Sequence, residues 1–589
     1  MCPHPLQQST FRWADVRDVD DFADKVKRYR AGTYPPDAFV KYRIHNGGYV
    51  TRLTSDYSML RVKVPAGRIS PEQLRRFSLL SEQYSIGSAH ITARENVQLH
   101  WVVLEDVPDI LRSLAEVDLT SRESCGDTVH NVVCSPTAGV CPDEVFDPTP
   151  YAEATSRFFL RNTMTQNIPR KFKITYDCCE NHGRARTADV GLVPQIRTVN
   201  GQARRGFKFF AGGGLGAKSC IARQIEDFTD EDNVIYTLIA VLKVYDRLGD
   251  RKSRHKNRLR YLVEQMGWEK FRNLILKERT AVRITQAARV NLDLEDMPAA
   301  VRRPVRISAE EVVEPGYSKW VQTSTFVQKQ PEYRTVFVTL EAGDISSRQL
   351  SDLADIIEEY SGESTARLGL IQNVVLRYVH QDDLVSLYSR LLKANLARTG
   401  ALTMAATLGC VGMSSCNLAL TNSHRMAKEI QRQFLKRGLD EDKDLWGSSI
   451  KVSGCPNSCG QHVVATVGLY GGSGRNGRDM YPAYTMLIGG RTGADSTLGH
   501  KLANVPAKRV IPVILHLLDI FRERKQDGDN LESWIRRVCD GAEQTSVADL
   551  QDMVTPLISP PSRDDDPDFY TDYGTDIPYK IVIGRGCTK

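Results

Sequence analysis

The sequence predicts an α+β protein made of two similar halves that face a single site. Residues 59–102 and 335–379 each read as an alternating apolar strand, an Ala-Gly turn, an amphipathic helix and a further strand. The likeness returns at an offset of 277 residues, where 173–191 resembles 450–468. A period this long excludes a solenoid. We therefore expect each half to hold a small α+β unit followed by a larger α/β unit.

The helix of each small unit has a recognisable start and buried face. Ser70 and Ser346 follow the Ala-Gly turn and are the expected N-caps. Apolar residues then recur at helical spacing: Leu74, Phe77 and Leu80 in the first copy, and Leu350, Leu353, Ile356 and Ile357 in the second. We expect one continuous strand to close each unit, over 90–103 and 368–379.

The larger units also repeat, because 207–217 resembles 484–494 at the same offset of 277 residues. The first copy contains the run Gly-Gly-Gly-Leu-Gly at 212–216. Backbone N–H groups of such a run can bind a phosphate or a carboxylate. A tight structural turn explains it equally well, and the spacing of a dinucleotide fingerprint is missing.

Composition excludes several classes of protein. The 589 residues hold 78 Lys and Arg against 72 Asp and Glu, a net charge of +6. This balance argues against a nucleic-acid partner. The longest apolar runs, 234–241 and 510–520, are far shorter than a membrane span. The first 30 residues lack the apolar core of a secretion signal, so we expect a cytoplasmic protein without membrane insertion.

Thirteen cysteines are too dilute for a disulfide scaffold, which indicates metal binding or redox chemistry. Four form the pairs Cys410-x5-Cys416 and Cys455-x3-Cys459, and glycines flank both pairs. Thiolates suit iron–sulfur clusters or zinc. The five-residue gap is unusual for zinc. Gly-rich surroundings of low charge favour a [4Fe–4S] cluster. Zinc and unligated cysteines remain alternatives.

The other nine cysteines carry weaker signals. Adjacent Cys178 and Cys179 are expected in the core. Cys125, Cys134 and Cys141 share a loop-rich stretch whose spacing admits a metal site, although buried free thiols explain it better. The remaining thiols have structural or incidental roles in our interpretation, with Cys587 either a reactive thiol or part of a tail without a role: Cys2, Cys220, Cys539 and Cys587.

Polar and basic side chains alternate along the expected strand 90–103 and share one face: His90, Arg94, Asn96, Gln98 and His100. Arg61 lies on the neighbouring strand, and Arg170, Lys171 and Lys173 precede the Cys178 turn. A solvated surface is the plain alternative. Together these groups could hold a polyanion through charge-assisted bonds to carboxylates.

The two halves differ in what they keep at this site. Arg61, Arg94 and Gln98 have Phe337, Ile371 and Val375 as their counterparts. In the other direction, Cys459 has His182 as its counterpart. One half thus holds cations and the other a complete thiol set, which predicts one composite site between them.

These motifs resemble the siroheme- and [4Fe–4S]-containing sulfite and nitrite reductases, from about Tyr42 to about Ala548. The cysteine spacing, the strand from Ile91 to His100 and the segment Pro-Arg-Lys-Phe-Lys at 169–173 carry the resemblance. It implies a three-domain, pseudo-twofold duplicated fold, with ferredoxin-like half units and two larger α/β units around one cofactor site. It also implies a cluster on Cys410, Cys416, Cys455 and Cys459, with the Cys459 thiolate shared with the siroheme iron.

The resemblance also assigns roles to single residues. It implies that residues of the strand, one basic residue after it and one residue of the cysteine turn contact the siroheme: Arg94, Asn96, Gln98, His100, Arg170 and Asn457. It implies that Arg61, Lys171 and Lys173 surround the substrate anion. His130 is a departure, because the family usually has Arg there; the change either weakens binding of sulfite or supplies a proton donor. Retention of both lysines favours sulfite. Tyr34 and Cys125 match positions that are covalently linked in some relatives.

The implied reaction is the six-electron reduction of sulfite to sulfide, with nitrite to ammonia as the alternative. An external ferredoxin or flavoprotein would donate the electrons. A non-catalytic iron–sulfur carrier and a zinc-stabilised interaction protein are the alternatives from other classes. The expected division of the chain is an N-terminal arm at 1–41, paired half-domains at 42–118 and 317–398, a siroheme and substrate domain at 119–316, a cluster domain at 399–558 and a C-terminal arm at 559–589.

Overall fold

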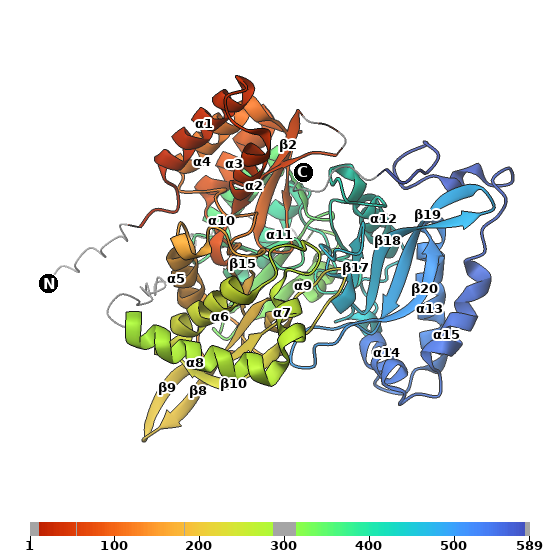
Figure 1. The fold of residues 1–589 in the computed structure, drawn as a ribbon. Coiled ribbons are helices and arrows are strands. Elements are labelled where there is room, and N and C mark those ends of the chain that lie inside the picture. Colours follow the sequence, from red (N-terminus) through yellow and green to blue (C-terminus); the bar gives the residue numbers. More distant parts are fainter. Residues whose placement is uncertain (1–10, 53, 55, 182, 287–313, 583–589) are drawn as a thin grey trace.

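The computed structural model describes residues 11–52, 54, 56–181, 183–286 and 314–582. Cys2, His182 and Cys587 lie outside the described residues. Within them the strands form four five-stranded sheets, two in the small units and two in the larger units. Figure 1 shows the small units together at the upper left, the first larger unit below them and the second on the right.

The sheets of the small units are antiparallel, and each contains one strand from the other half. The first sheet has the order β1 (Gly48–Val50), β2 (Tyr57–Lys63), β5 (Asn96–Val103), β4 (Ser88–Ile91) and β13 (Asp344–Ser346). The second has the order β11 (Thr325–Val327), β12 (Tyr333–Thr339), β15 (Asn373–His380), β14 (Ala366–Leu368) and β3 (Arg68–Ile69). Strands β13 and β3 are therefore exchanged between the halves.

The predicted helices of the small units are confirmed, together with their starts. Helix α3 (Pro71–Tyr84) and helix α10 (Ser347–Tyr360) each begin with a capping box. The Ser70 hydroxyl accepts a hydrogen bond from the Gln73 backbone N–H, and Ser346 accepts the same bond from Gln349. These bonds satisfy backbone donors that the helix cannot satisfy itself. Further helices cover the sheets: α4 (Val107–Glu116), α9 (Tyr317–Ser324) and α11 (Leu384–Lys393).

The prediction of one strand over 90–103 was wrong. The chain reverses between β4 and β5, so that His90 pairs with Gln98 on the neighbouring strand. Thr92 closes the turn, because its hydroxyl accepts from the Asn96 N–H (3.1 Å) and its own N–H donates to the Asn96 carbonyl (3.0 Å). Glu95 has a φ of 54° there, a conformation that sequence alternation cannot reveal in a non-glycine residue.

The expected strand over 368–379 is wrong for the same reason. The second half turns at Gln372 (φ 62°) between β14 and β15. Each small unit is therefore a strand, a helix and a hairpin, and the hairpin gives each unit two strands where the sequence predicted one.

The larger units share one topology. The first sheet holds, from one edge to the other, β6 (Val133–Cys134), β7 (Ile174–Tyr176), β8 (Val190–Val199), β9 (Gln202–Ala211) and β10 (Arg223–Asp230). The second holds β16 (Leu408–Gly409), β17 (Ile450–Ser453), β18 (Val467–Asn476), β19 (Asp479–Ile488) and β20 (His500–Pro506). In both, the first three strands are parallel and the last two pairings are antiparallel.

Helices bury the faces of these sheets. The two long apolar runs of the sequence lie in α6 (Val234–Leu248) and α13 (Val510–Arg524), which are central to the two cores. The other helices of the larger units are α5 (Thr149–Phe159), α7 (Leu259–Met266), α8 (Trp268–Gln286), α12 (Ser423–Lys436), α14 (Leu531–Asp540) and α15 (Val547–Val554). Within the described residues, no helix combines the length and the apolar character that crossing a membrane requires.

Both terminal segments pack on the rest of the chain. The segment expected as an N-terminal arm forms α1 (Val16–Arg30), and α2 (Pro36–His45) begins within it. In the C-terminal segment, Phe569 and Tyr570 are buried against Tyr481 of β19. The Tyr579 hydroxyl donates to the Leu420 carbonyl (2.9 Å), which fixes this segment beside one of the cysteine loops.

Candidate functional site

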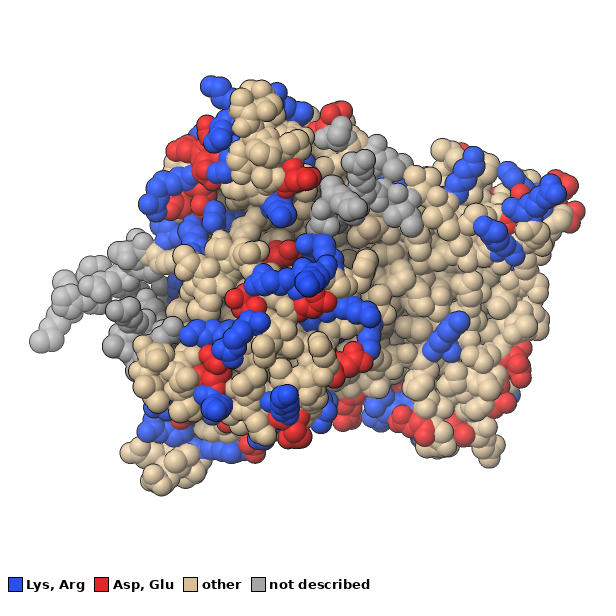
Figure 2. All heavy atoms as spheres, viewed as in Figure 1, with Lys and Arg blue, Asp and Glu red and all other residues tan. Residues whose placement is uncertain are grey.

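A cavity of about 1750 Å³ lies where the two halves meet. The structure brings every predicted site residue to its lining: Arg61, Arg94, Asn96, Gln98, His100, His130, Arg170, Lys171, Lys173, Cys410, Cys416, Cys455, Asn457 and Cys459. In Figure 2, Lys and Arg side chains gather near the middle of the face shown, with acidic side chains among them, and the face over β18 and β19 carries few charges. Cations and thiols therefore meet in one space, and their individual roles remain predictions.

The cysteine side of the cavity is built by loops that leave two parallel strands. Cys410 follows β16 directly, and Cys455 and Cys459 lie in the loop after β17. The Cys410 sulfur accepts from the Gly454 N–H (3.2 Å), and the Cys416 sulfur accepts from the Leu418 N–H (3.4 Å). Such N–H groups stabilise a thiolate.

The spacing of these four sulfurs does not suit a single ion. A tetrahedral zinc site, with Zn–S bonds of about 2.3 Å, needs sulfurs about 3.8 Å apart. No three of the four come within 4.8 Å of one another. Glycine lets the two cysteine loops approach each other closely. A Cβ on Gly454 would lie 2.8 Å from the Thr421 carbonyl and 3.0 Å from the Gly412 Cα of the other loop. The geometry thus favours a larger inorganic group over zinc.

Unligated thiols would be neutral here. Burial raises the pKa of the Cys410 and Cys455 thiols, and the nearby Cys459 raises it further. Thiolates at these positions therefore require the positive charge of a metal group.

Strand pairing positions the cations on the opposite side. Arg61 on β2 is the register partner of Gln98 on β5. With the Gln98 amide oriented toward it, the carbonyl oxygen of Gln98 accepts from the Arg61 Nε (3.0 Å) and Nη2 (2.7 Å). Arg94 lies in the hairpin turn rather than on a strand, and its Nη2 donates to the Asn131 carbonyl (3.0 Å). Lys171 and Lys173 lie in the segment that leads into β7.

The electrostatics of the cavity indicate an anionic ligand. Burial holds the pKa of Lys173 well below its ordinary value, and the cations Arg94 and Lys171 lower it further. Burial likewise lowers the pKa of His130, with Lys171 and Lys173 adding to the effect. The His130 Nε2 donates to the Gly126 carbonyl (2.9 Å) in the neutral ring. An anion would relieve this repulsion among half-buried like charges.

Some buried polar atoms facing the cavity have no partner within the described chain. They include the His100 Nδ1 and the Asn96 Oδ1. Burial lowers the pKa of His100 to about 3, so the ring is neutral. Buried polar atoms without partners are rare in folded proteins, and a ligand in the cavity would account for these.

Two arginines of this site, Arg258 and Arg260, were missed by the sequence analysis. Arg258 is buried and forms an ion pair with the buried Asp189 (2.7 Å), which also accepts from the Lys173 backbone N–H (2.9 Å). A Cβ on Gly216 would lie 2.8 Å from the Arg260 Nη2, so the Gly-rich run packs directly on the arginines. Arg258 and Arg260 are two residues apart in the sequence, a spacing that could have indicated a shared face. They lie in a stretch rich in Lys and Arg, however, and such a stretch is typical of an exposed surface.

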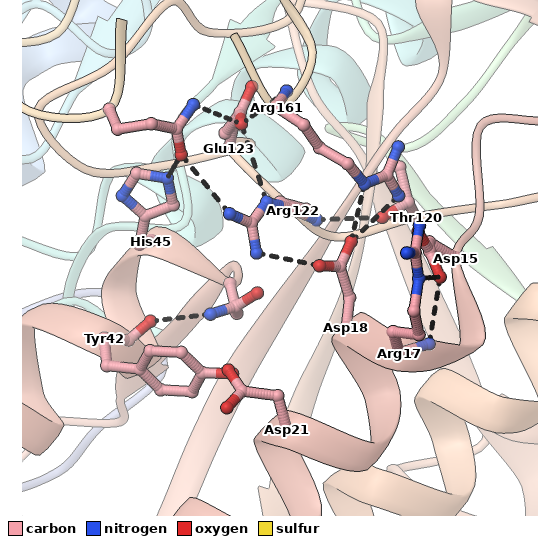
Figure 3. A network of polar contacts seen from close by, with 12 residues as sticks. Asp15, Arg17, Asp18, Asp21, Tyr42, His45, Thr120, Arg122, Glu123 and Arg161 are labelled. Atoms are coloured by element: carbon pink, nitrogen blue, oxygen red, sulfur yellow. Dashed lines mark hydrogen bonds and ion pairs between the residues drawn. The ribbon is translucent and has the colours of Figure 1, made fainter. Parts of the chain in front are cut away.

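A polar network supports the rim of the cavity (Figure 3). Asp18 of α1 accepts from Arg122 (2.9 Å) and Arg161 (2.8 Å). The amide of Gln166 bridges Glu123 (2.9 Å) and the cavity-lining His45 (3.2 Å). The N-terminal helix is thereby coupled to the loop that leads to Cys125 and His130.

Tyr34 lies away from the cavity. Its ring packs edge-on against Phe39 (6.4 Å between centroids), and it does not line the cavity. Cys125 is buried, and its sulfur accepts from the Arg61 Nη1 (3.3 Å). The tyrosine beside that same guanidinium is Tyr49 (5.7 Å). The suggested link between Tyr34 and Cys125 stays a prediction.

Comparison with known proteins matches both kinds of unit. The family profile described as "Nitrite and sulphite reductase 4Fe-4S domain" matches residues 125–284 and 401–540, and "Nitrite/Sulfite reductase ferredoxin-like half domain" matches 52–117 and 326–394. The chain is 30% identical to "Sulfite reductase [ferredoxin] 1" of Mycolicibacterium paratuberculosis, covering 82% of this chain and 83% of that protein. It is 30% identical to the chloroplastic ferredoxin–nitrite reductase of Spinacia oleracea, covering 78% and 74%.

A solved structure shares the fold. The NirA protein of Mycobacterium tuberculosis superposes with a TM-score of 0.74 at 23% identity, over 91% of this chain and 96% of that chain. The predicted duplicated α+β fold with ferredoxin-like half units is confirmed.

Proposed function

Because this chain belongs to the nitrite and sulfite reductase family, we propose that it reduces sulfite to sulfide with six electrons from an external donor. The family is one of oxidoreductases that use siroheme and a [4Fe–4S] cluster. Sulfite rather than nitrite, the donor and the residue roles below are parts of the proposal.

The residues at the cavity fit both cofactors. Siroheme carries several carboxylates, and the lining supplies Arg94, Arg170, Arg258 and Arg260 among its cations. We assign Asn96, Gln98, His100 and Asn457 to contacts with the macrocycle, since all four line the same cavity. Cys410, Cys416, Cys455 and Cys459 would ligate the cluster, with Cys459 shared with siroheme. When bound, the two groups would supply electrons one at a time and a metal centre able to bind the substrate.

One observation carries the substrate assignment: Arg61, Lys171 and Lys173 line the same cavity as His130, close enough to lower its pKa. Three cations around one point suit a small, highly charged anion. Arg61 and the two lysines would neutralise the substrate and hold it against the cofactor. The lysines would also donate protons as bonds to oxygen break. His130 in its neutral form donates from Nε2 to Gly126, so its Nδ1 would accept a hydrogen bond and relay a proton.

Charge favours sulfite over nitrite. Sulfite can bind as a dianion, because its second proton is lost near neutral pH and nearby cations favour that loss, whereas nitrite is a monoanion. A site rich in cations therefore gains more from sulfite. His130 is the observation that favours nitrite, because a neutral ring replaces a permanent cation. A relative named as a sulfite reductase and one named as a nitrite reductase are almost equally identical to this chain, at 30% and 29%. A non-catalytic carrier would need the cysteines and leave the cations without a ligand.

The donor is proposed to be a ferredoxin, because the names of relatives on both sides of the family include one. The net charge of +6 suits an acidic partner. A flavoprotein remains the alternative, and rates with each reduced donor distinguish the two.

The test begins with protein purified without oxygen. Its absorption spectrum should show siroheme and cluster bands, and turnover is then measured with sulfite and nitrite under a reduced dye. We expect kcat/KM for sulfite to exceed that for nitrite by about tenfold or more. His130→Arg should raise the preference for sulfite. A higher kcat/KM for nitrite, unchanged in His130→Arg, would establish the alternative substrate.

A further inference from the structure

A second group of thiols lies outside the cavity. Cys141, Cys178 and Cys179 are at most 5% exposed, and none of them lines the cavity. The Cys179 sulfur is 3.9 Å from the Cys141 sulfur and 3.9 Å from the Cys178 sulfur. All three sulfurs lie within 4.8 Å of one another. We call this group the thiol triad.

The triad has the dimensions of a single-ion site. A point equidistant from three sulfurs at these separations lies about 2.3 to 2.5 Å from each, close to the length of a metal–thiolate bond. The four cysteines at the cavity are spread more widely. The two thiol groups of this chain thus differ in size, one matching an ion and the other a cluster.

The position of the triad in the fold matches that of the cavity cysteines. Cys141 lies in the loop after β6, and Cys178 and Cys179 follow β7. Cys410 follows β16 and Cys455 follows β17, which are the corresponding strands of the second sheet. The carboxyl ends of parallel strands are where α/β sheets bind ligands. Both halves therefore place thiols at the same topological location.

The ligand set selects the kind of ion. Zinc in structural sites takes four ligands. Among the described residues the triad supplies three sulfurs, and the neutral hydroxyl of Thr137, 3.5 Å from the Cys178 sulfur, is a poor ligand. Copper(I) is soft and prefers thiolates. We propose that the thiol triad binds one copper(I) ion in three-sulfur coordination, independently of the reductase site.

The test uses the full-length holoenzyme, purified without oxygen from cells grown with added copper. Copper, zinc and iron per chain are measured for the wild type and for Cys141→Ser, Cys178→Ser and the control Cys134→Ser. Cys134 is a buried cysteine at the end of β6 and outside the triad. X-ray absorption at the copper edge then counts the sulfur ligands.

We expect about one copper per chain in the wild type and in Cys134→Ser, and loss of at least about nine-tenths of it in both triad variants, with iron unchanged. If a triad variant loses iron as well, its fold has changed. The X-ray absorption spectrum of the wild type at the copper edge then decides whether three sulfurs bind the copper. Three sulfurs at about 2.3 Å support the proposal. Copper bound by nitrogen or oxygen, one zinc in its place, or a copper-free wild type would overturn it.

Discussion

The two larger sheets have the same strand order, yet they meet the cavity with opposite ends. In the first half, His130 and Lys173 lie just before β6 and β7, at the amino ends of the strands. In the second half, Cys410 and Cys455 lie just after β16 and β17, at the carboxyl ends. The duplicated pattern thus determines the strand order, while the loops decide which end of each sheet serves the site.

This difference separates two incompatible requirements. Cluster ligands need thiolates in loops of low charge, and an anion site needs several cations in a small volume. Had both sets come from one end of one sheet, the lysines would lie beside the thiolates and could pair with them instead of with an anion. In this arrangement they meet only across the cavity, where Cys459 raises the pKa of Lys173 against the lowering by burial and by neighbouring cations.

The largest effect should come from the thiolate half. Cys459→Ser removes the proposed shared ligand, and we expect turnover to fall to background with loss of iron or of the coupled absorption bands. Iron analysis and the absorption spectrum provide the measurement, with Cys134→Ser as the first-half control. Full iron and an unaltered spectrum would refute the assignment of Cys459.

The next effect tests the cationic half. Lys173→Met should lower kcat by about 10²–10³-fold, since it removes a positive charge that would stabilise the negative charge of the bound substrate, and cofactor absorbance should stay intact. Its position in the second half is Ile450, a buried residue of β17. Ile450→Val should leave turnover unchanged. Equal turnover in the wild type and in Lys173→Met would show that this cation of the first half does not contribute to the reaction.

Stability should also differ between the halves. Arg258→Met leaves Asp189 buried without its cation, which we expect to cost about 3–5 kcal/mol. The second-half counterpart of Asp189 is Thr466, whose hydroxyl accepts from the Ser449 N–H (3.0 Å). Thr466→Ala should cost only about 1 kcal/mol. Thermal unfolding of both holoenzymes checks this, and similar shifts in Tm would mean that the ion pair contributes no more than the hydroxyl.

The smallest effect should be the same in both halves. Ser70→Ala and Ser346→Ala each remove the cap of a corresponding helix, and each should lower the free energy of unfolding by about 1 kcal/mol. The two capping bonds have the same length, 3.2 Å. Denaturant titration of the two variants gives the comparison, and a difference above about 1 kcal/mol would show that only one cap is needed.

Much of this architecture could be predicted from local chemistry. The caps at Ser70 and Ser346 and the cysteine spacing depend on neighbouring residues, and the sequence displays them directly. The turn at Glu95 could not be predicted, because a positive φ in a non-glycine residue leaves no mark in apolar alternation. Arg258 was missed because its buried partner, Asp189, is 69 residues away. Which end of a sheet meets the cavity depends on how the halves pack.

The exchange of β3 and β13 has a consequence for biosynthesis. Strand β4 is made early, but β13, the strand that covers its edge, comes about 250 residues later. At ordinary rates of translation that edge waits on the order of ten to fifty seconds. An uncovered strand edge is a template for pairing with another chain. The first half should therefore depend on chaperones until the second half leaves the ribosome, and truncated chains that end before β13 should aggregate.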